Sequence, residues 1–115
     1  MEELIFLALV AAFSFNALAS TQDEINHLLR FVAATDCHYE RNGTMHTRLE
    51  AVKHIQRKYQ YYVDDIASTE DFICYSATKS YMSGKYYLVH CGDHAAIKSE
   101  DWLLLELKTY RAANN

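Results

Sequence analysis

The scarcity of turn-forming residues limits what this chain can fold into more than any other feature. The sequence contains no proline and only three glycines among its 115 residues. Loop-rich and all-β architectures depend on these two residue types, so their scarcity favours helices joined by few tight turns. Half of the residues are apolar, which is typical of a folded domain, and the length supports one domain at most.

The first nineteen residues are predicted to be a signal peptide that is cleaved after Ala19. Leu4 to Phe15 form an apolar run that is shorter than the ~20 residues needed to cross a bilayer. Asn16 to Ala19 supply the small residues of a cleavage site, although Met1-Glu2-Glu3 lacks the usual positive charge. A buried N-terminal helix is the alternative. Residues 20–115 are then expected to form a single exported domain, with no membrane span after cleavage.

Four segments are predicted to be helices, because residues that cap helices precede apolar residues at helical spacing. The predicted starts are Thr21 (a capping box with Glu24), Thr47 (a capping box with Glu50), Ser68 or Thr69, and Ser99. The first three helices are expected to end near Ala34, Ile66 and Met82-Ser83-Gly84.

Two shorter regions are predicted to form a small sheet. Asn42-Gly43 lies between short extended runs, which is the strongest local signal for a β-hairpin because both turn residues need positive φ. A two-residue turn places Tyr39 opposite His46. Lys85 to Cys91 is rich in aromatic and branched residues and predicts a third strand. The expected fold is α+β, a three-stranded antiparallel sheet (the hairpin plus the last strand) packed against three to four helices.

The three cysteines are predicted to form one disulfide and one free thiol. Cys37 opens the hairpin and Cys91 closes the last strand, so the two meet if these strands are neighbours, and export favours their oxidation. Cys74 is expected to be buried and free. A metal site that combines Cys37-His38 with Cys91 and His94 is the weaker alternative, because oxidised sulfur does not bind zinc. We therefore expect no metal and no cofactor.

Charge excludes one class of partner. The whole chain has a net charge of −4, and it stays negative after Glu2 and Glu3 are removed. This balance leaves no basic surface of the kind that binds nucleic acid or an anionic membrane.

One polar helix face is the main candidate for a site. Glu50, His54 and Lys58 recur every four residues, so they share a face of the second helix, which begins just after the hairpin bearing Arg41. This set suits proton transfer or anion binding. The alternative is a solvated stripe of ordinary ion pairs, which we prefer to catalysis, so no catalytic residue is predicted.

The connection before the last strand is a second candidate. It contains Ser80, Ser83 and Lys85 around a glycine, and such a polar segment can present backbone donors to a partner. A plain loop between a helix and a strand is the alternative.

Several short motifs resemble the YfeK-like family of small exported proteobacterial proteins, a domain of unknown function. The matching motifs are Arg41-Asn42-Gly43, Glu50-Ala51 with His54, Thr69-Glu70-Asp71-Phe72-Ile73, Ala77-Thr78-Lys79-Ser80, Ser83-Gly84-Lys85 and Asp101-Trp102-Leu103. The resemblance extends from about Ile25 to Arg111, and Tyr86 stands where a proline is expected. It implies a periplasmic location in a Gram-negative bacterium and no particular activity.

The sequence therefore predicts a non-enzymatic binding or interaction module of the cell envelope. Its small size, its export and the lack of a complete catalytic set favour this function. The partner is an envelope protein or a small ligand whose identity stays open. The alternative is a small envelope enzyme that uses His54 and Glu50 as an acid–base pair.

Overall fold

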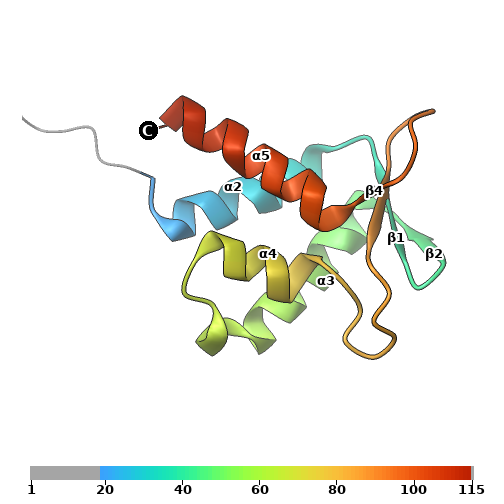
Figure 1. The fold of residues 1–115 in the computed structure, drawn as a ribbon, viewed down its shortest axis with the longest axis horizontal. Coiled ribbons are helices and arrows are strands. Elements are labelled where there is room, and N and C mark those ends of the chain that lie inside the picture. Colours follow the sequence, from blue (N-terminus) through green and yellow to red (C-terminus); the bar gives the residue numbers. More distant parts are fainter. Residues whose placement is uncertain (1–18, 115) are drawn as a thin grey trace, which may run out of the picture.

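The structure is a computed structural model that describes residues 19–114. The predicted signal peptide lies outside the described residues, apart from Ala19. Helices α2 (Thr21–Ala34), α3 (Arg48–Tyr61), α4 (Thr69–Ala77) and α5 (Ser99–Asn114) pack against one another, and the 3₁₀ turn η1 (Val63–Asp65) links α3 to α4. Figure 1 shows the helices at one end of the molecule and the strands at the other. Within residues 19–114, every helix is too short or too polar to cross a membrane.

The strands form an antiparallel sheet with the order β2-β1-β3-β4. They comprise β1 (His38–Arg41), β2 (Thr44–His46), β3 (Leu88–His90) and β4 (Ile97–Lys98). The α+β class is confirmed, but the predicted number of three strands is wrong, because β4 adds an edge strand. β4 has only two residues, and both are exposed. It therefore lacks the alternation of apolar and polar residues from which a strand is predicted.

The hairpin forms as predicted. Tyr39 pairs with His46 and Arg41 pairs with Thr44 across β1 and β2. Asn42 and Gly43 both have positive φ, of 54° and 80°, as this two-residue turn requires. The turn therefore fixes the direction in which β1 ends, and with it the position of Arg41.

The helix starts are confirmed at two positions and wrong by one residue at a third. Thr47 and Ser68 cap α3 and α4, and Glu50 completes the first of these capping boxes. The capping residue of α2 is Ser20, whose side chain accepts from the Asp23 amide, and not Thr21. Glu24 cannot serve the predicted box, because it is buried and bound to other helices.

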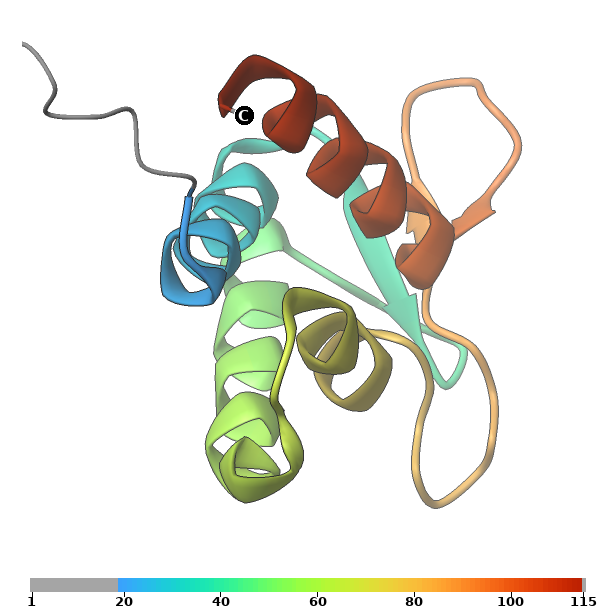
Figure 2. The ribbon, with the colours of Figure 1, turned by 60° about the vertical axis from the view of Figure 1, so that its left-hand side comes forward.

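Two helices end earlier than predicted. α3 stops at Tyr61 rather than at Ile66, because the chain turns into η1 and packs Ile66 against the core from beyond the helix. α4 stops at Ala77, because the chain folds back instead of continuing to Gly84. Thr78 and Ser80 then pair with Tyr87 and Lys85 through backbone hydrogen bonds. The segment 78–87 projects beside the hairpin turn (Figure 2).

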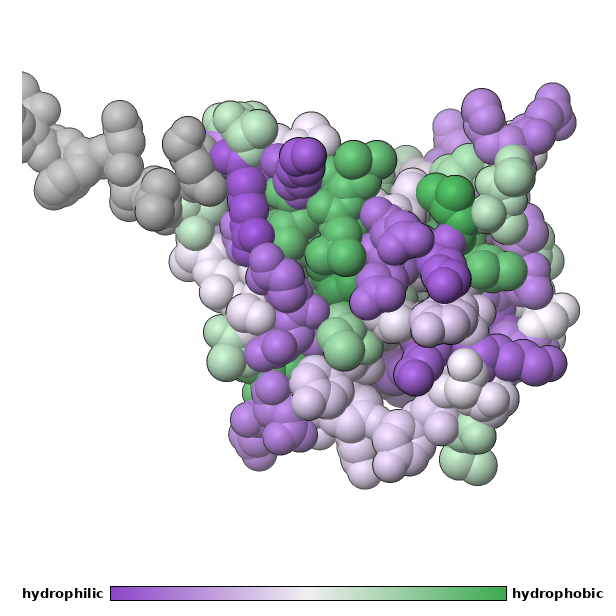
Figure 3. Space-filling model, in the orientation of Figure 1, coloured by the Kyte–Doolittle hydropathy of each residue, from purple (hydrophilic) through white to green (hydrophobic). Residues whose placement is uncertain are grey.

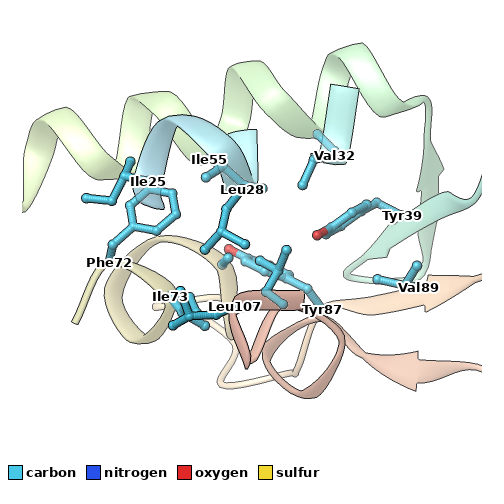
Figure 4. Close-up of a cluster of buried hydrophobic side chains, with 13 residues drawn as sticks. Ile25, Leu28, Val32, Tyr39, Ile55, Phe72, Ile73, Tyr87, Val89 and Leu107 are labelled. Atoms are coloured by element: carbon cyan, nitrogen blue, oxygen red, sulfur yellow. The ribbon is translucent and has the colours of Figure 1, made fainter. Parts of the chain in front are cut away.

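The core lies between the helices and the inner face of the sheet (Figure 4). Ile25, Leu28, Ile55 and Phe72 come from three helices and are each 1% exposed. Tyr87 enters this core from the segment before β3 (Figure 4). Its aromatic ring is thus fixed by packing, which decides where its hydroxyl group can lie.

The disulfide between Cys37 and Cys91 is confirmed, with a Cα–Cα distance of 4.4 Å. It joins the beginning of β1 to the end of β3. Cys74 is a free thiol, as expected, but it is exposed rather than buried. The prediction was wrong because Phe72 and Ile73 turn inward, so the next position on α4 faces outward.

Candidate functional site

Three elements bring the candidate residues together. The hairpin places Arg41 at the end of β1, α3 places His54 and Lys58 one turn apart, and the segment before β3 contributes Tyr87. All four line a hollow with a volume of about 400 Å³. Asn42, Arg57 and Ser80 complete its polar lining. We call this the cationic hollow.

The Tyr87 hydroxyl group is the hub of the hydrogen bonds in the cationic hollow. The Lys58 ammonium donates to it over 3.1 Å and also donates to the Lys79 carbonyl oxygen over 2.8 Å. The Nε2 atom of His54 lies 3.0 Å from the same hydroxyl. Because Lys58 has no acceptor, Tyr87 accepts from it and can donate its own proton to a neutral His54. One Lys58 proton is left for a ligand.

The electrostatics agree with a neutral histidine. The pKa of His54 is lowered to about 4, mainly by burial and in addition by Arg41, Lys58 and Arg57, which repel a positive charge on the ring. Burial and Arg41 also lower the pKa of Lys58, and burial raises the pKa of Tyr87. His54 is therefore an uncharged hydrogen-bonding group near pH 7.

The cations of the cationic hollow are not neutralised within it, although Arg41 contributes to lowering the pKa of the exposed Glu50 outside it. No Asp or Glu is among the residues that line it. Within residues 19–114, neither Arg41 nor Arg57 forms an ion pair. Arg41 and Lys58 are half-buried and Arg57 is exposed. Positive charges that are close together repel one another unless an anion lies between them, and the repulsion is strongest for the less solvated pair. The arrangement can therefore bind a carboxylate or a phosphate.

Only two of the three residues on the predicted helix face belong to the site. His54 and Lys58 line the cationic hollow, whereas Glu50 is exposed and turns back to accept from the Thr47 amide over 2.9 Å. That hydrogen bond is the main reason why the pKa of Glu50 is lowered. No hydrogen bond joins Glu50 to His54 in the part of the chain that the structure describes. The two residues thus do not form the acid–base pair that the alternative hypothesis needs.

The second predicted segment divides in a similar way. Ser80 lines the cationic hollow. Ser83 is exposed and donates to the Asn42 side chain over 2.6 Å, which ties the segment to the hairpin turn. Lys85 is exposed, and its backbone carbonyl accepts from the Ser80 amide. The segment therefore contributes shape more than charge.

Sequence reasoning missed the aromatic residues of the site. The rim of the cationic hollow contains Tyr61, Tyr62, Tyr81 and Met82, in addition to Tyr87 on its inner side. One signal for them was available in the sequence. Tyr81 and Met82 are large apolar side chains in a polar segment after α4, where exposed side chains of this kind indicate a binding surface.

The cysteines leave the metal alternative without its ligands, because the disulfide occupies both Cys37 and Cys91. Among residues 19–114, no group of three or more His, Cys, Asp or Glu side chains is placed to hold a metal ion.

Fold and site together define a small, disulfide-linked α+β domain with a hollow that is suited to anions. Residues 19–111 match the model of a family of unknown function, DUF5329. The match covers most of the chain, and the protein belongs to this family. No curated protein matches the sequence, and no solved structure matches it.

Proposed function

We propose that this protein is a non-enzymatic binding module of the bacterial periplasm, and that the cationic hollow holds the anionic group of its ligand. The observation that carries this proposal is the set of three cations, Arg41, Arg57 and Lys58, in a hollow that no carboxylate lines. A carboxylate or phosphate of the ligand would accept the free Lys58 proton and pair with Arg41.

Three features support the periplasmic location. The Cys37–Cys91 disulfide is the kind of bond that persists in an oxidising compartment. The apolar segment from Leu4 to Phe15 has the length and composition of a signal peptide. The resemblance to the YfeK-like proteins, which stays a prediction, points to the same location.

The geometry gives the enzyme alternative less support. A general base needs a free nitrogen within reach of the substrate. When the Nε2 atom of His54 accepts from the Tyr87 hydroxyl group, the proton of the neutral ring is on Nδ1, so neither nitrogen is a free base. Glu50 is used to cap α3. We therefore propose that His54 takes part in binding and not in proton transfer.

The proposal is tested by titrating the protein with sodium acetate and inorganic phosphate while the imidazole signals of His54 are followed by NMR. Sodium chloride at equal ionic strength is the reference. We expect roughly millimolar binding. We also expect the pKa of His54 to rise from about 4, because a bound anion offsets the positive charges around the ring.

Two arginine variants make the test specific. Arg41→Gln removes a cation of the hollow and should weaken binding about tenfold. This corresponds to a loss of about 1.4 kcal/mol of binding free energy. Arg30→Gln changes an exposed arginine on α2 and should leave binding unchanged. Equal binding by both variants, or His54 signals that respond only to ionic strength, would refute the proposal.

A further inference from the structure

A second hollow adjoins the cationic hollow. It has a volume of about 200 Å³ and shares Lys58, Tyr62 and Tyr81 with it. The remaining lining residues are Cys74 and Tyr75 on α4, and Lys79 just after it. We call this the tyrosine hollow. Two hollows in series are larger than a single small anion requires, so the surface suits an extended ligand.

The rim of the two hollows exposes several aromatic side chains and a methionine. Tyr61 is 81% exposed, Tyr81 is 83% exposed and Met82 is 94% exposed. Tyr62 packs against Tyr61 and Tyr75, with ring centroids 4.8 and 5.2 Å apart. In Figure 3, pale side chains of intermediate hydropathy gather along the lower edge of the molecule. Tyrosine, methionine and arginine are the residues that dominate protein–protein contacts.

The charges that line the two hollows disfavour two classes of ligand, neutral sugars and nucleic acid. Neither hollow is lined by an Asp or Glu, whereas Arg41, Arg57, Lys58 and Lys79 are all present. A neutral sugar offers no charge to offset these cations, and its hydroxyl groups would lose hydrogen bonds to water against the apolar tyrosine hollow. A long polyanion such as nucleic acid is disfavoured by the net charge of −4.

We infer that the partner is an acidic peptide segment of another protein, in which a carboxylate neighbours an apolar side chain. The carboxylate lies in the cationic hollow against Arg41 and Lys58. The apolar side chain lies in the tyrosine hollow against the packed rings of Tyr62 and Tyr75. This inference rests on the proposed function, since the first contact is the anion site itself, and it adds the class of partner.

Cys74 provides a direct test, because it is an exposed free thiol that lines the tyrosine hollow. The probes are acetyl-Glu-Leu-Glu-Leu-Glu-Phe-amide and the matched peptide with Gln in place of Glu. The rate at which iodoacetamide alkylates Cys74 is measured with each peptide and with acetate alone. We expect the acidic peptide to slow alkylation at least fivefold, whereas the neutral peptide and acetate leave the rate unchanged.

A pair of tyrosine variants tests the tyrosine hollow by fluorescence anisotropy of the labelled acidic peptide. Tyr75→Ala removes an exposed side chain that lines the tyrosine hollow but not the cationic hollow, so it should leave the fold intact and weaken peptide binding about fivefold without changing acetate binding. Tyr86→Ala is the control, because Tyr86 is also exposed but packs against Lys98 and lines neither hollow. Equal losses in the two variants would overturn the inference.

The outcomes separate this inference from the proposed function. One outcome is that acetate shifts the His54 signals, but the acidic peptide binds no more tightly than acetate and leaves Cys74 unprotected. In that case the inference of a peptide partner is wrong, and the proposed anion site is supported. If neither acetate nor peptide binds, both proposals fail. If an oligosaccharide of uronic acids binds more tightly than the peptide and protects Cys74, an anionic glycan replaces the peptide.

Discussion

Two fully buried serines differ in what their hydroxyl groups contact. Ser99 pairs with the Tyr39 hydroxyl over 2.9 Å, whereas the hydroxyl of Ser76 has no hydrogen-bond partner among residues 19–114. We expect Ser76→Ala to raise the free energy of unfolding by about 1 kcal/mol, because the uncompensated desolvation of its hydroxyl disappears. Ser99→Ala should lower it by about 1–3 kcal/mol, since it orphans the buried Tyr39 hydroxyl. Urea unfolding measures both, and the same sign for both variants would contradict this account.

Single residues also show where prediction from sequence stops. Thr21 with Glu24 and Ser20 with Asp23 both fit a capping box, and local rules do not separate them. The structure selects Ser20 because Glu24 binds Thr69 over 2.6 Å and Arg111 on α5. Those partners are far away in the chain, so only the packed fold decides between the two boxes.

Arg111 links three helices through its guanidinium group. It bonds to both carboxylate oxygens of Glu24 on α2 and of Glu70 on α4. Arg111→Met should lower the free energy of unfolding by about 2 kcal/mol at pH 7, less than for a fully buried pair because Arg111 is partly exposed. Arg30→Met is the control with no such contacts.

The pH dependence of this loss follows from the two carboxylates. The hydrogen bonds to Arg111 hold the pKa of Glu24 and of Glu70 below their usual value of 4.5. A lowered pKa gives stability above the unfolded pKa that is lost as the pH falls through the folded pKa. The difference between wild type and Arg111→Met should therefore shrink below about pH 4.5. A constant difference from pH 7 to pH 3 in urea unfolding would show that Arg111 acts by packing alone.

Elements were predictable where their signals are local. The Asn42-Gly43 turn needs only its own two residues, so the hairpin and its register followed from the sequence. The ends of α3 and α4 could not be predicted in this way. The end of α3 depends on the packing of Ile66 against the core, and the end of α4 depends on the pairing of Thr78 with Tyr87. β4 exists only through its pairing with β3, which two exposed residues do not signal.

At the scale of the whole molecule, the site was half predictable. The four-residue spacing identified His54 and Lys58 as neighbours on one face, and the hairpin placed Arg41 close by. The partner that organises them, Tyr87, comes from a segment 29 residues beyond Lys58. Only the packing of that segment between helices and sheet brings its hydroxyl group to the histidine. The sequence therefore identified Arg41, His54 and Lys58, but neither Arg57 nor the aromatic side chains that line the same hollow.

The Cys37–Cys91 disulfide stabilises the whole fold, because it closes a loop with a sequence separation of 54. In the chain-entropy model, a loop of this length is worth about 4 kcal/mol, a large part of the ~5–15 kcal/mol of a typical domain. We expect Cys37→Ala with Cys91→Ala to lower the free energy of unfolding by that amount, in a Cys74→Ser background that prevents reshuffling. Urea unfolding of the oxidised parent, with and without reductant, is the matched comparison. Equal stability in all three states would mean that strand pairing alone holds β1 against β3, and that the bridge is not needed to keep Arg41 and Tyr87 together.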